Sequence, residues 1–389
     1  MADEEEDKPA GEVGICSDVL ETILSHVPLV YLVSAADVSR SWGSAVDSSL
    51  RHHNKPKPWL ILHTQGTRHP HATTTQAYDP CSKLWIRIRK PSIKHVAALR
   101  SSHSSLLYMV SPSRFSFSSD PFNFTWCHVD PPLVWRTDPI VARVGEFVVV
   151  AGGACDFEED PLAVEIYSLG TQSWCACESM PGIFKDSAAS QWQSVAATAE
   201  KLIITDNKSG LTHWFDPETK SWSEPIVLNP GQPVFHFNIG YAMEKLILVG
   251  LCRIEDVELV QIWSFDPEDL SEYEEIGNMP PEFVHKLRSE SFGISSLKIC
   301  ASEDIVYMYN PSEVSELVAC EIVHGGGCRW WSVPNLVGRE EMMMNQLVFL
   351  CSKVGIDELR RVMKHECKEH DSAASLRPVE GERDFVLSL

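Results

Sequence analysis

Residues 214–222 read Trp-Phe-Asp-Pro-Glu-Thr-Lys-Ser-Trp, an aromatic-Asp-Pro phrase closed by a second aromatic residue. The chain repeats this phrase in whole or in part at 77–85, 165–174 and 264–273, the last with Tyr273 where a tryptophan would stand. Two weaker copies carry only Trp126 and the pair Trp330-Trp331. The aromatic markers therefore fall at positions 85, 126, 174, 222, 273 and 331, which are 41 to 58 residues apart. Similarity at such a period is typical of a repeat architecture with one supersecondary unit per copy.

Each copy opens with a run of strongly β-forming residues. The runs lie at 59–62, 106–110, 147–151, 201–205, 246–249 and 305–309. The third ends in Gly152-Gly153, which resembles the diglycine of the kelch signature, and we expect small residues there because blades taper toward a central channel. The pattern predicts an all-β six-bladed kelch-type β-propeller over residues 59–351, with the tryptophans between blades.

The last apolar run, at about 345–350, has the composition of a strand but starts no new unit. A closed ring must hide its strand edges. We therefore expect this run to return to the first blade, which begins at Trp59 and whose outer strand would otherwise be unpaired. The following residues 352–389 are charged and predict a tail with a short helical stretch at 357–362.

Residues 13–53 have a different pattern, which predicts three helices. Residues 15–29 read Ile-Cys-Ser-Asp-Val-Leu-Glu-Thr-Ile-Leu-Ser-His-Val-Pro-Leu, with apolar residues at helical spacing, Ser17 as a cap and Pro28 as a stop. A second helix is expected at 29–36, and a third has Trp42 and Val46 on its apolar side. About forty residues seldom bury enough surface to fold alone, so this unit is expected to offer apolar surface to a partner or to the rest of the chain.

This helical segment resembles the F-box, the module through which a substrate receptor docks on the Skp-type adaptor of a cullin-RING ubiquitin ligase. The resemblance implies an adaptor-binding set of Ile15, Leu20, Ile23, Leu24, Pro28, Leu32 and Trp42. The chain departs from the family at Ile15-Cys16, where the family has Leu-Pro, and the missing proline removes a restraint on the helix start.

An F-box followed by kelch copies is similar to the plant F-box/kelch-repeat proteins over roughly residues 13–351. The resemblance implies a substrate receptor of an SCF-type E3 ligase, whose propeller binds a target protein for ubiquitination and proteasomal degradation. The resemblance to several members of this family also implies a target among the enzymes of phenylpropanoid and flavonoid synthesis, such as chalcone synthase.

The net charge of the chain limits the classes of partner that it is expected to bind. The chain has 54 acidic and 33 basic residues, a net charge of −21, which argues against nucleic acid and anionic membrane surfaces and favours a basic partner. No apolar run approaches the roughly 18 residues that span a bilayer. Residues 1–12 predict an acidic disordered tail and 54–58 a short, semi-rigid Pro/Lys linker. Because the tail is unlike a signal peptide, we expect a cytoplasmic or nuclear protein with reduced cysteines.

No motif predicts catalysis, a cofactor or a bound metal. Cys175-Ala176-Cys177 has poor spacing for zinc, His365, Cys367 and His370 lie in a polar segment, and Gly325-Gly326-Gly327 lacks the residues that complete a phosphate-binding loop. We therefore expect a non-catalytic receptor without cofactor or metal. Two alternatives stay open: a kelch binding module or scaffold with a degenerate F-box, as Cys16 suggests, and a propeller enzyme.

The loops after the second strand of each blade are, by the resemblance, where kelch receptors hold their targets. Acidic residues gather in three of these loops, and the expected target-binding set is Asp156, Phe157, Glu158, Glu159, Glu255, Asp256 and Glu313. An aromatic side chain between carboxylates can hold a basic, partly apolar patch. A solvated rim without a partner is the alternative.

Overall fold

The computed structural model describes residues 17–52, 56–88, 97–122, 125–153, 160–185, 192–255, 257–289, 293–323 and 326–369. Contacts between Cα atoms divide the chain into two compact units. One is Met1–Pro56 together with Gly355–Arg361, and the other is Lys57–Val354 together with Val362–Leu389. We describe each unit by itself.

The first unit is helical, as the sequence predicts. It contains α1 (Ser17–Leu24), α2 (Leu29–Ala36) and α3 (Arg40–His52), and both α1 and α2 contact α3. The described residues of these three helices bury seven apolar side chains: Leu20, Leu24, Leu29, Leu32, Val33, Ala45 and Val46. Helix α1 ends at Leu24, before Pro28, which instead occupies the N-cap position of α2. A missing N–H costs nothing at a helix start.

The segment after Lys353 differs from the charged tail with a short helical stretch that the sequence suggests. It forms α7 (Ile356–Glu369), a helix of fourteen residues. Leu359 is 1% exposed, and Arg360 Nη2 lies 3.6 Å from Asp37 Oδ1 at the end of α2. The first turns of α7 therefore belong to the helical unit, although more than three hundred residues separate them from α2 along the chain.

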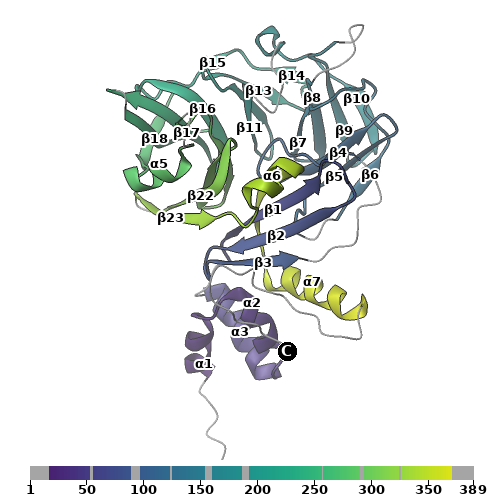
Figure 1. The fold of residues 1–389 in the computed structure, drawn as a ribbon. Helices are drawn as coiled ribbons and strands as arrows, with labels where there is room; N and C mark the ends of the chain where they lie inside the picture. The colour runs from purple at the N-terminus through teal and green to yellow at the C-terminus, as the bar shows by residue number, and fades with distance from the viewer. Residues whose placement is uncertain are drawn as a thin grey trace, which may run out of the picture. The chain divides into compact units, whose positions relative to one another are not determined.

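The second unit is a six-bladed β-propeller, in agreement with the sequence prediction (Figure 1). The sheets of the first three blades are β24-β1-β2-β3 (Asn345–Lys353, Pro58–Gly66, Thr73–Asp79, Leu84–Ile88), β4-β5-β6 (Leu107–Ser111, Arg114–Ser118, Cys127–Val129) and β7-β8-β9-β10 (Ile140–Val144, Phe147–Ala151, Val164–Ser168, Ser173–Ala176). The fourth is β11-β12-β13-β14 (Gln193–Ala197, Leu202–Asp206, Leu211–Asp216, Ser221–Trp222), to which β15 (Ile226–Val227) adds beside β13. The last two are β16-β17-β18-β19 (Val234–Ala242, Lys245–Ile254, Val257–Phe265, Tyr273–Asn278) and β20-β21-β22-β23 (Lys298–Ser302, Ile305–Asn310, Glu313–Ile322, Cys328–Pro334).

Within the described residues, the second blade has three strands. Its inner position is taken by a single antiparallel bridge between Arg100 and Tyr108, a residue of β4.

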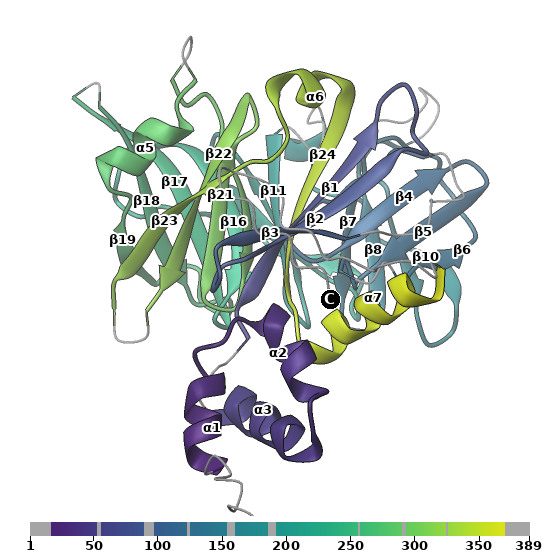
Figure 2. The same cartoon turned by 60° about the horizontal axis from the view of Figure 1, so that its bottom comes forward.

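The closing strand is present, but on the other side of the blade from the one expected. Strand β24 pairs antiparallel with β1 over nine residue pairs, from Pro58–Lys353 to Gly66–Asn345, while β3 remains at the opposite edge (Figure 2). It also contacts β20, which contacts β16, so β24 continues the row of inner strands around the channel. The chain thus closes the ring by supplying the inner strand of the first blade, and not its outer strand.

The repeated phrase has a structural cause at each of its positions. Asp79 and Asp216 accept backbone N–H groups two residues ahead, at 2.9 and 2.8 Å, and so fix the turn before the outer strand. The tryptophan then packs on the aromatic residue before the Asp, as in Phe215–Trp222 with ring centroids 5.1 Å apart. In the first, third and fourth blades its indole N–H donates to a carbonyl of the preceding blade: Trp85 to Pro334, Trp174 to Asp130 and Trp222 to Glu178. These tryptophans therefore join neighbouring blades.

Gly152 and Gly153 are needed for a reason other than the taper of the blade. They follow β8 with φ of +62° and +97°, in the region that favours glycine. A Cβ on Gly153 would come within 2.8 Å of the Thr137 carbonyl, so the diglycine also admits a close backbone approach.

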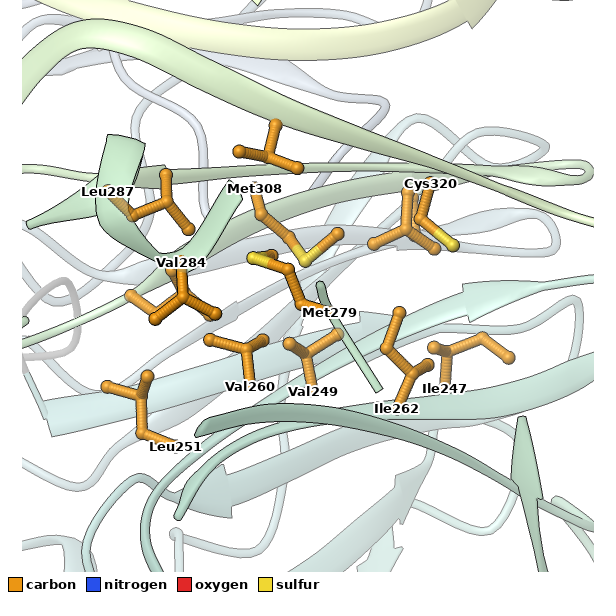
Figure 3. Close-up of a cluster of buried hydrophobic side chains, with 14 of the residues drawn as sticks. Ile247, Val249, Leu251, Val260, Ile262, Met279, Val284, Leu287, Met308 and Cys320 are labelled. Carbon is orange, nitrogen blue, oxygen red and sulfur yellow. The ribbon is translucent and has the colours of Figure 1, made fainter. Parts of the chain in front are cut away.

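Apolar side chains fill the space between blades. In the cluster between the fifth and sixth blades, Val249 and Ile262 face Met308 and Cys320 (Figure 3). Helix α5 (Pro281–Leu287), which the sequence analysis did not anticipate, adds Val284 and Leu287 to this cluster.

Candidate functional sites: an exposed helix face and a loop face

The helical unit exposes a group of large apolar side chains. Val19 and Ile23, four residues apart on α1, are 52% and 50% exposed, and Tyr31 and Val38 are 39% and 63% exposed. Residues four apart in a helix lie on the same face. We call Val19, Ile23, Tyr31 and Val38 the exposed helix group.

The structure divides the predicted adaptor-binding residues into three classes. Leu20, Leu24 and Leu32 are buried in the core of the unit, so they support the fold and offer no surface of their own. Ile23 is exposed, while Pro28 and Trp42 are half-buried. Ile15 lies outside the described residues. Val19, which is also exposed, lies four residues before Ile23 on α1, so helical spacing could have identified it as an adaptor-binding residue.

The loops of the propeller fall on two opposite faces because its strands are antiparallel. In each blade the connection from the second to the third strand, and the connection from the outer strand to the next inner strand, emerge on the same side. We call this side the loop face. Of the eleven large apolar side chains exposed on the described part of the propeller, eight lie there: Leu133, Ile183, Trp192, Val227, Ile254, Val257, Met343 and Met344. Exposed apolar residues gathered on one face indicate an interaction surface.

Leu133, 71% exposed, is held by a buried ion pair. The Glu165 carboxylate accepts the backbone N–H groups of Leu133 and Val134 at 2.6 and 3.2 Å. Arg136 donates to that carboxylate and to the carbonyl of Ala163. The side chains of Arg136 and Glu165 are only 1% and 2% exposed. This pair, which we call the Arg136–Glu165 clamp, fixes an otherwise irregular loop with an apolar residue at its tip.

Only two of the seven predicted target-binding residues lie in the described part of the chain. Asp156, Phe157, Glu158, Glu159 and Asp256 lie outside the described residues. Glu255 is exposed in the turn between β17 and β18, and Glu313 is half-buried at the start of β22, so both lie on the loop face. Their role in target binding stays a prediction.

The described charges of this face are mixed in sign. Glu258 lies 3.4 Å from Arg253 and 3.2 Å from Arg288, and Glu316 lies 2.9 Å from Lys286. Lys208 stands 3.9 Å from the ring centroid of Trp192, an arrangement that orients both side chains. On this part of the loop face, acidic and basic side chains therefore alternate.

The described residues contain no group of three or more His, Cys, Asp or Glu side chains arranged to hold a metal ion. The side chains of His365, Cys367 and His370 are outside the described part. None of the described helices combines the length and apolar character needed to cross a bilayer.

Comparison with known proteins agrees with both units. The F-box domain family matches residues 14–54. An F-box/kelch-repeat protein of Arabidopsis thaliana is 41% identical over 370 residues, which cover 91% of this chain and 93% of that protein. F-box only protein 6 of the same plant is 22% identical over 281 residues, covering 68% of this chain and 57% of its own. The solved structure of YjhT, at 14% identity and a TM-score of 0.37 over 53% of this chain and 67% of its own, is too distant to carry an argument. The identity and coverage of the first relative show that the chain belongs to the F-box/kelch-repeat proteins.

Proposed function

We propose that the protein is the substrate-recognition subunit of an SCF-type E3 ubiquitin ligase, in which the F-box docks on a Skp-type adaptor and the propeller holds a target. The family supports this role in general terms. The observation that carries it is the distribution of exposed apolar side chains: Val19 and Ile23 share one face of α1, and eight of the eleven exposed on the described part of the propeller lie on the loop face. Two such surfaces fit a protein that joins two partners. The family also suggests an adaptor without catalytic activity of its own.

The adaptor would contact the exposed helix group. The test is capture of a purified Skp-type adaptor by the variant Val19→Asp/Ile23→Asp. Burying two carboxylates in an apolar interface should abolish capture, since each unpaired charge costs several kcal/mol. The matched control is Thr22→Asp/Ser25→Asp, which adds the same charge on another side of the same turns and should leave capture intact.

The buried leucines give a less specific test. Leu24 is 2% exposed, so Leu24→Ala should lower stability by about 2 to 5 kcal/mol and reduce adaptor capture through unfolding. Normal capture by Val19→Asp/Ile23→Asp would exclude the exposed helix group as the adaptor surface. It would favour a binding module with a degenerate F-box.

The target would bind to the loop face. We take an enzyme of flavonoid or phenylpropanoid synthesis as the target to test first, with chalcone synthase foremost, because the family resemblance suggests that class. The assay is capture of purified chalcone synthase by the full chain, followed by its turnover in the presence of the assembled ligase. Capture lost in Leu133→Asp but kept in Leu84→Asp, which alters an exposed leucine outside the loop face, would support both the face and the target. Absence of capture by the unaltered chain would exclude chalcone synthase and leave the receptor role standing.

A further inference from the structure

Two cysteines share one side of the outer strand of the third blade. Cys175 lies in β10, and Cys177 continues that strand, since its N–H group donates to the Val164 carbonyl at 2.9 Å. Residues two apart in a strand lie on the same face. Both side chains are half-buried and pack against the apolar cluster between the third and fourth blades, and the Cys177 thiol donates to the Cys175 carbonyl at 3.8 Å. The two thiols therefore lie next to each other at this blade boundary.

A lysine of the fourth blade reaches the first of these thiols. Lys220 Nζ donates to Cys175 Sγ over 3.0 Å, and among the described residues it forms no ion pair with a carboxylate. Its backbone is held on both sides, because its N–H group donates to the Asp216 carbonyl at 2.8 Å and its carbonyl accepts the Glu178 N–H group at 3.4 Å. The hydrogen bond to Cys175 raises the pKa of Lys220, so this side chain remains an ammonium at neutral pH.

The surroundings of the two thiols give them different chemistry. A cysteine reacts as its thiolate, and a lysine beside the sulfur favours that form. Cys175 has such a neighbour, whereas burial raises the pKa of Cys177 to about 11, which keeps Cys177 a neutral thiol at neutral pH. An accessible nucleophilic sulfur beside a second thiol is the arrangement of oxidant-sensitive cysteines, in which one sulfur is oxidised and the other resolves it.

We propose that Cys175 and Cys177 form a peroxide-reactive dithiol, which hydrogen peroxide or a small organic hydroperoxide converts to a disulfide. In the first step the Cys175 thiolate attacks one peroxide oxygen. The O–O bond breaks, a sulfenic acid forms on Cys175, and the other oxygen takes a proton from solvent and leaves as water or an alcohol. In the second step the Cys177 sulfur attacks Cys175 Sγ, the S–O bond breaks, and the oxygen leaves as water with the Cys177 proton. Two thiols are thus oxidised and one peroxide is reduced.

The spacing of the two residues permits this bridge. Residues two apart in a strand have Cα atoms about 6.4 to 6.8 Å apart, and disulfides join Cα atoms about 4.4 to 6.8 Å apart. Because the bridge lies at the long end of this range, a dithiol reductant should reverse it readily. The inference is independent of the ligase role, since this strand belongs to neither of the two proposed protein-binding surfaces.

The test is treatment of the reduced full chain with a small excess of hydrogen peroxide, followed by alkylation of the remaining thiols and peptide mapping by mass spectrometry. The Cys175–Cys177 disulfide should form before any oxidation of Cys127, an exposed thiol whose pKa is raised by partial burial, and dithiothreitol should remove it. In Cys177→Ser the reaction should stop at the sulfenic acid of Cys175, which dimedone traps.

Variants of Lys220 test the role of the ammonium. Lys220→Gln should slow disulfide formation about tenfold, because the cation that favours the thiolate is removed. Lys220→Arg keeps a cation at this position and should retain most of the rate. Lys208→Gln is the matched control, since it removes another exposed lysine of the fourth blade, in the turn between β12 and β13, and should leave the rate unchanged.

Three results would overturn the proposal. The first is oxidation of Cys127 as fast as that of Cys175 in the unaltered chain. The second is an equal rate of disulfide formation in the unaltered chain and in Lys220→Gln. The third is a disulfide that joins Cys175 to a cysteine other than Cys177, or the absence of a dimedone adduct on Cys175 in Cys177→Ser.

Discussion

The Arg136–Glu165 clamp can be tested by Glu165→Gln, which keeps the shape of the side chain and removes its charge. The Arg136 guanidinium, whose side chain is only 1% exposed, would then lose the Glu165 carboxylate to which it donates. Breaking a buried ion pair at one partner costs about 3 to 5 kcal/mol. For a propeller of about 300 residues the unfolding entropy is roughly 0.6 kcal/mol per kelvin, so the melting temperature should fall by about 5 to 8 °C.

Two companion variants separate this mechanism from a general loss of charge. Glu146→Gln removes the carboxylate of the exposed Arg143–Glu146 pair, where the atoms are 3.7 Å apart and the side chains 42% and 74% exposed. An exposed pair contributes about 0 to 1 kcal/mol, so this variant should melt within about 2 °C of the unaltered protein. Arg136→Met/Glu165→Leu removes both charges and should recover much of the stability that Glu165→Gln loses, because no buried charge remains.

The functional part of the test concerns Leu133. In the double variant the N–H groups of Leu133 and Val134 lose their acceptor, so the loop should be released while the propeller remains folded. Target capture should then weaken although stability is largely restored. The measurements are melting curves by circular dichroism and capture of the target at equal protein concentration. A melting temperature of Glu165→Gln within about 2 °C of the unaltered protein would refute the reasoning.

Three further predictions follow from other parts of the structure. A chain ending at Val354 should lose adaptor capture, because it lacks buried Leu359, whereas a chain ending at Glu369 should keep it; equal capture by both would exclude a role for α7. Trp222→Phe should lower the melting temperature by about 1 to 2 °C, since it removes one interblade hydrogen bond of about 1 kcal/mol to Glu178, and an unchanged value would show that the bond is replaced by water. Stability should fall as the pH drops from about 6.5 to about 4, because His103 takes up a proton in the unfolded state and remains neutral in the folded state, and His103→Gln should flatten this part of the stability curve.

The sequence predicted the features that local spacing controls. The phrase around Trp222 is a turn and a ring contact within nine residues, so its repetition revealed the six blades. The helices of the F-box follow from apolar spacing in the same way. The inner position of β24 and the burial of Leu359 depend on partners about three hundred residues away, and no local pattern encodes that distance. The sequence identifies the Gly152-Gly153 pair, but not why glycine is required there. The reason, a positive φ at both residues and the close Thr137 carbonyl, is visible only in the fold.

The candidate surfaces were harder to derive than the fold, because exposure is a property of the assembled chain. The apolar pattern of α1 gave the same weight to Leu20 and Val19, yet one is 5% and the other 52% exposed. Acidic loops were selected for their charge, whereas the described loop face is distinguished by its apolar side chains.

An exposed leucine by itself needs no explanation, because much of any protein surface is apolar. Leu133 differs because its loop is held by two almost completely buried charged side chains, each of which must be desolvated when the chain folds. An apolar core at this position would fold at least as readily, so stability alone does not account for the Arg136–Glu165 clamp. The ion pair instead fixes the position of Leu133, because its carboxylate accepts two successive backbone N–H groups. A rigid apolar side chain on a face with seven others reduces the entropy lost when a partner binds, which is the property expected of a binding anchor.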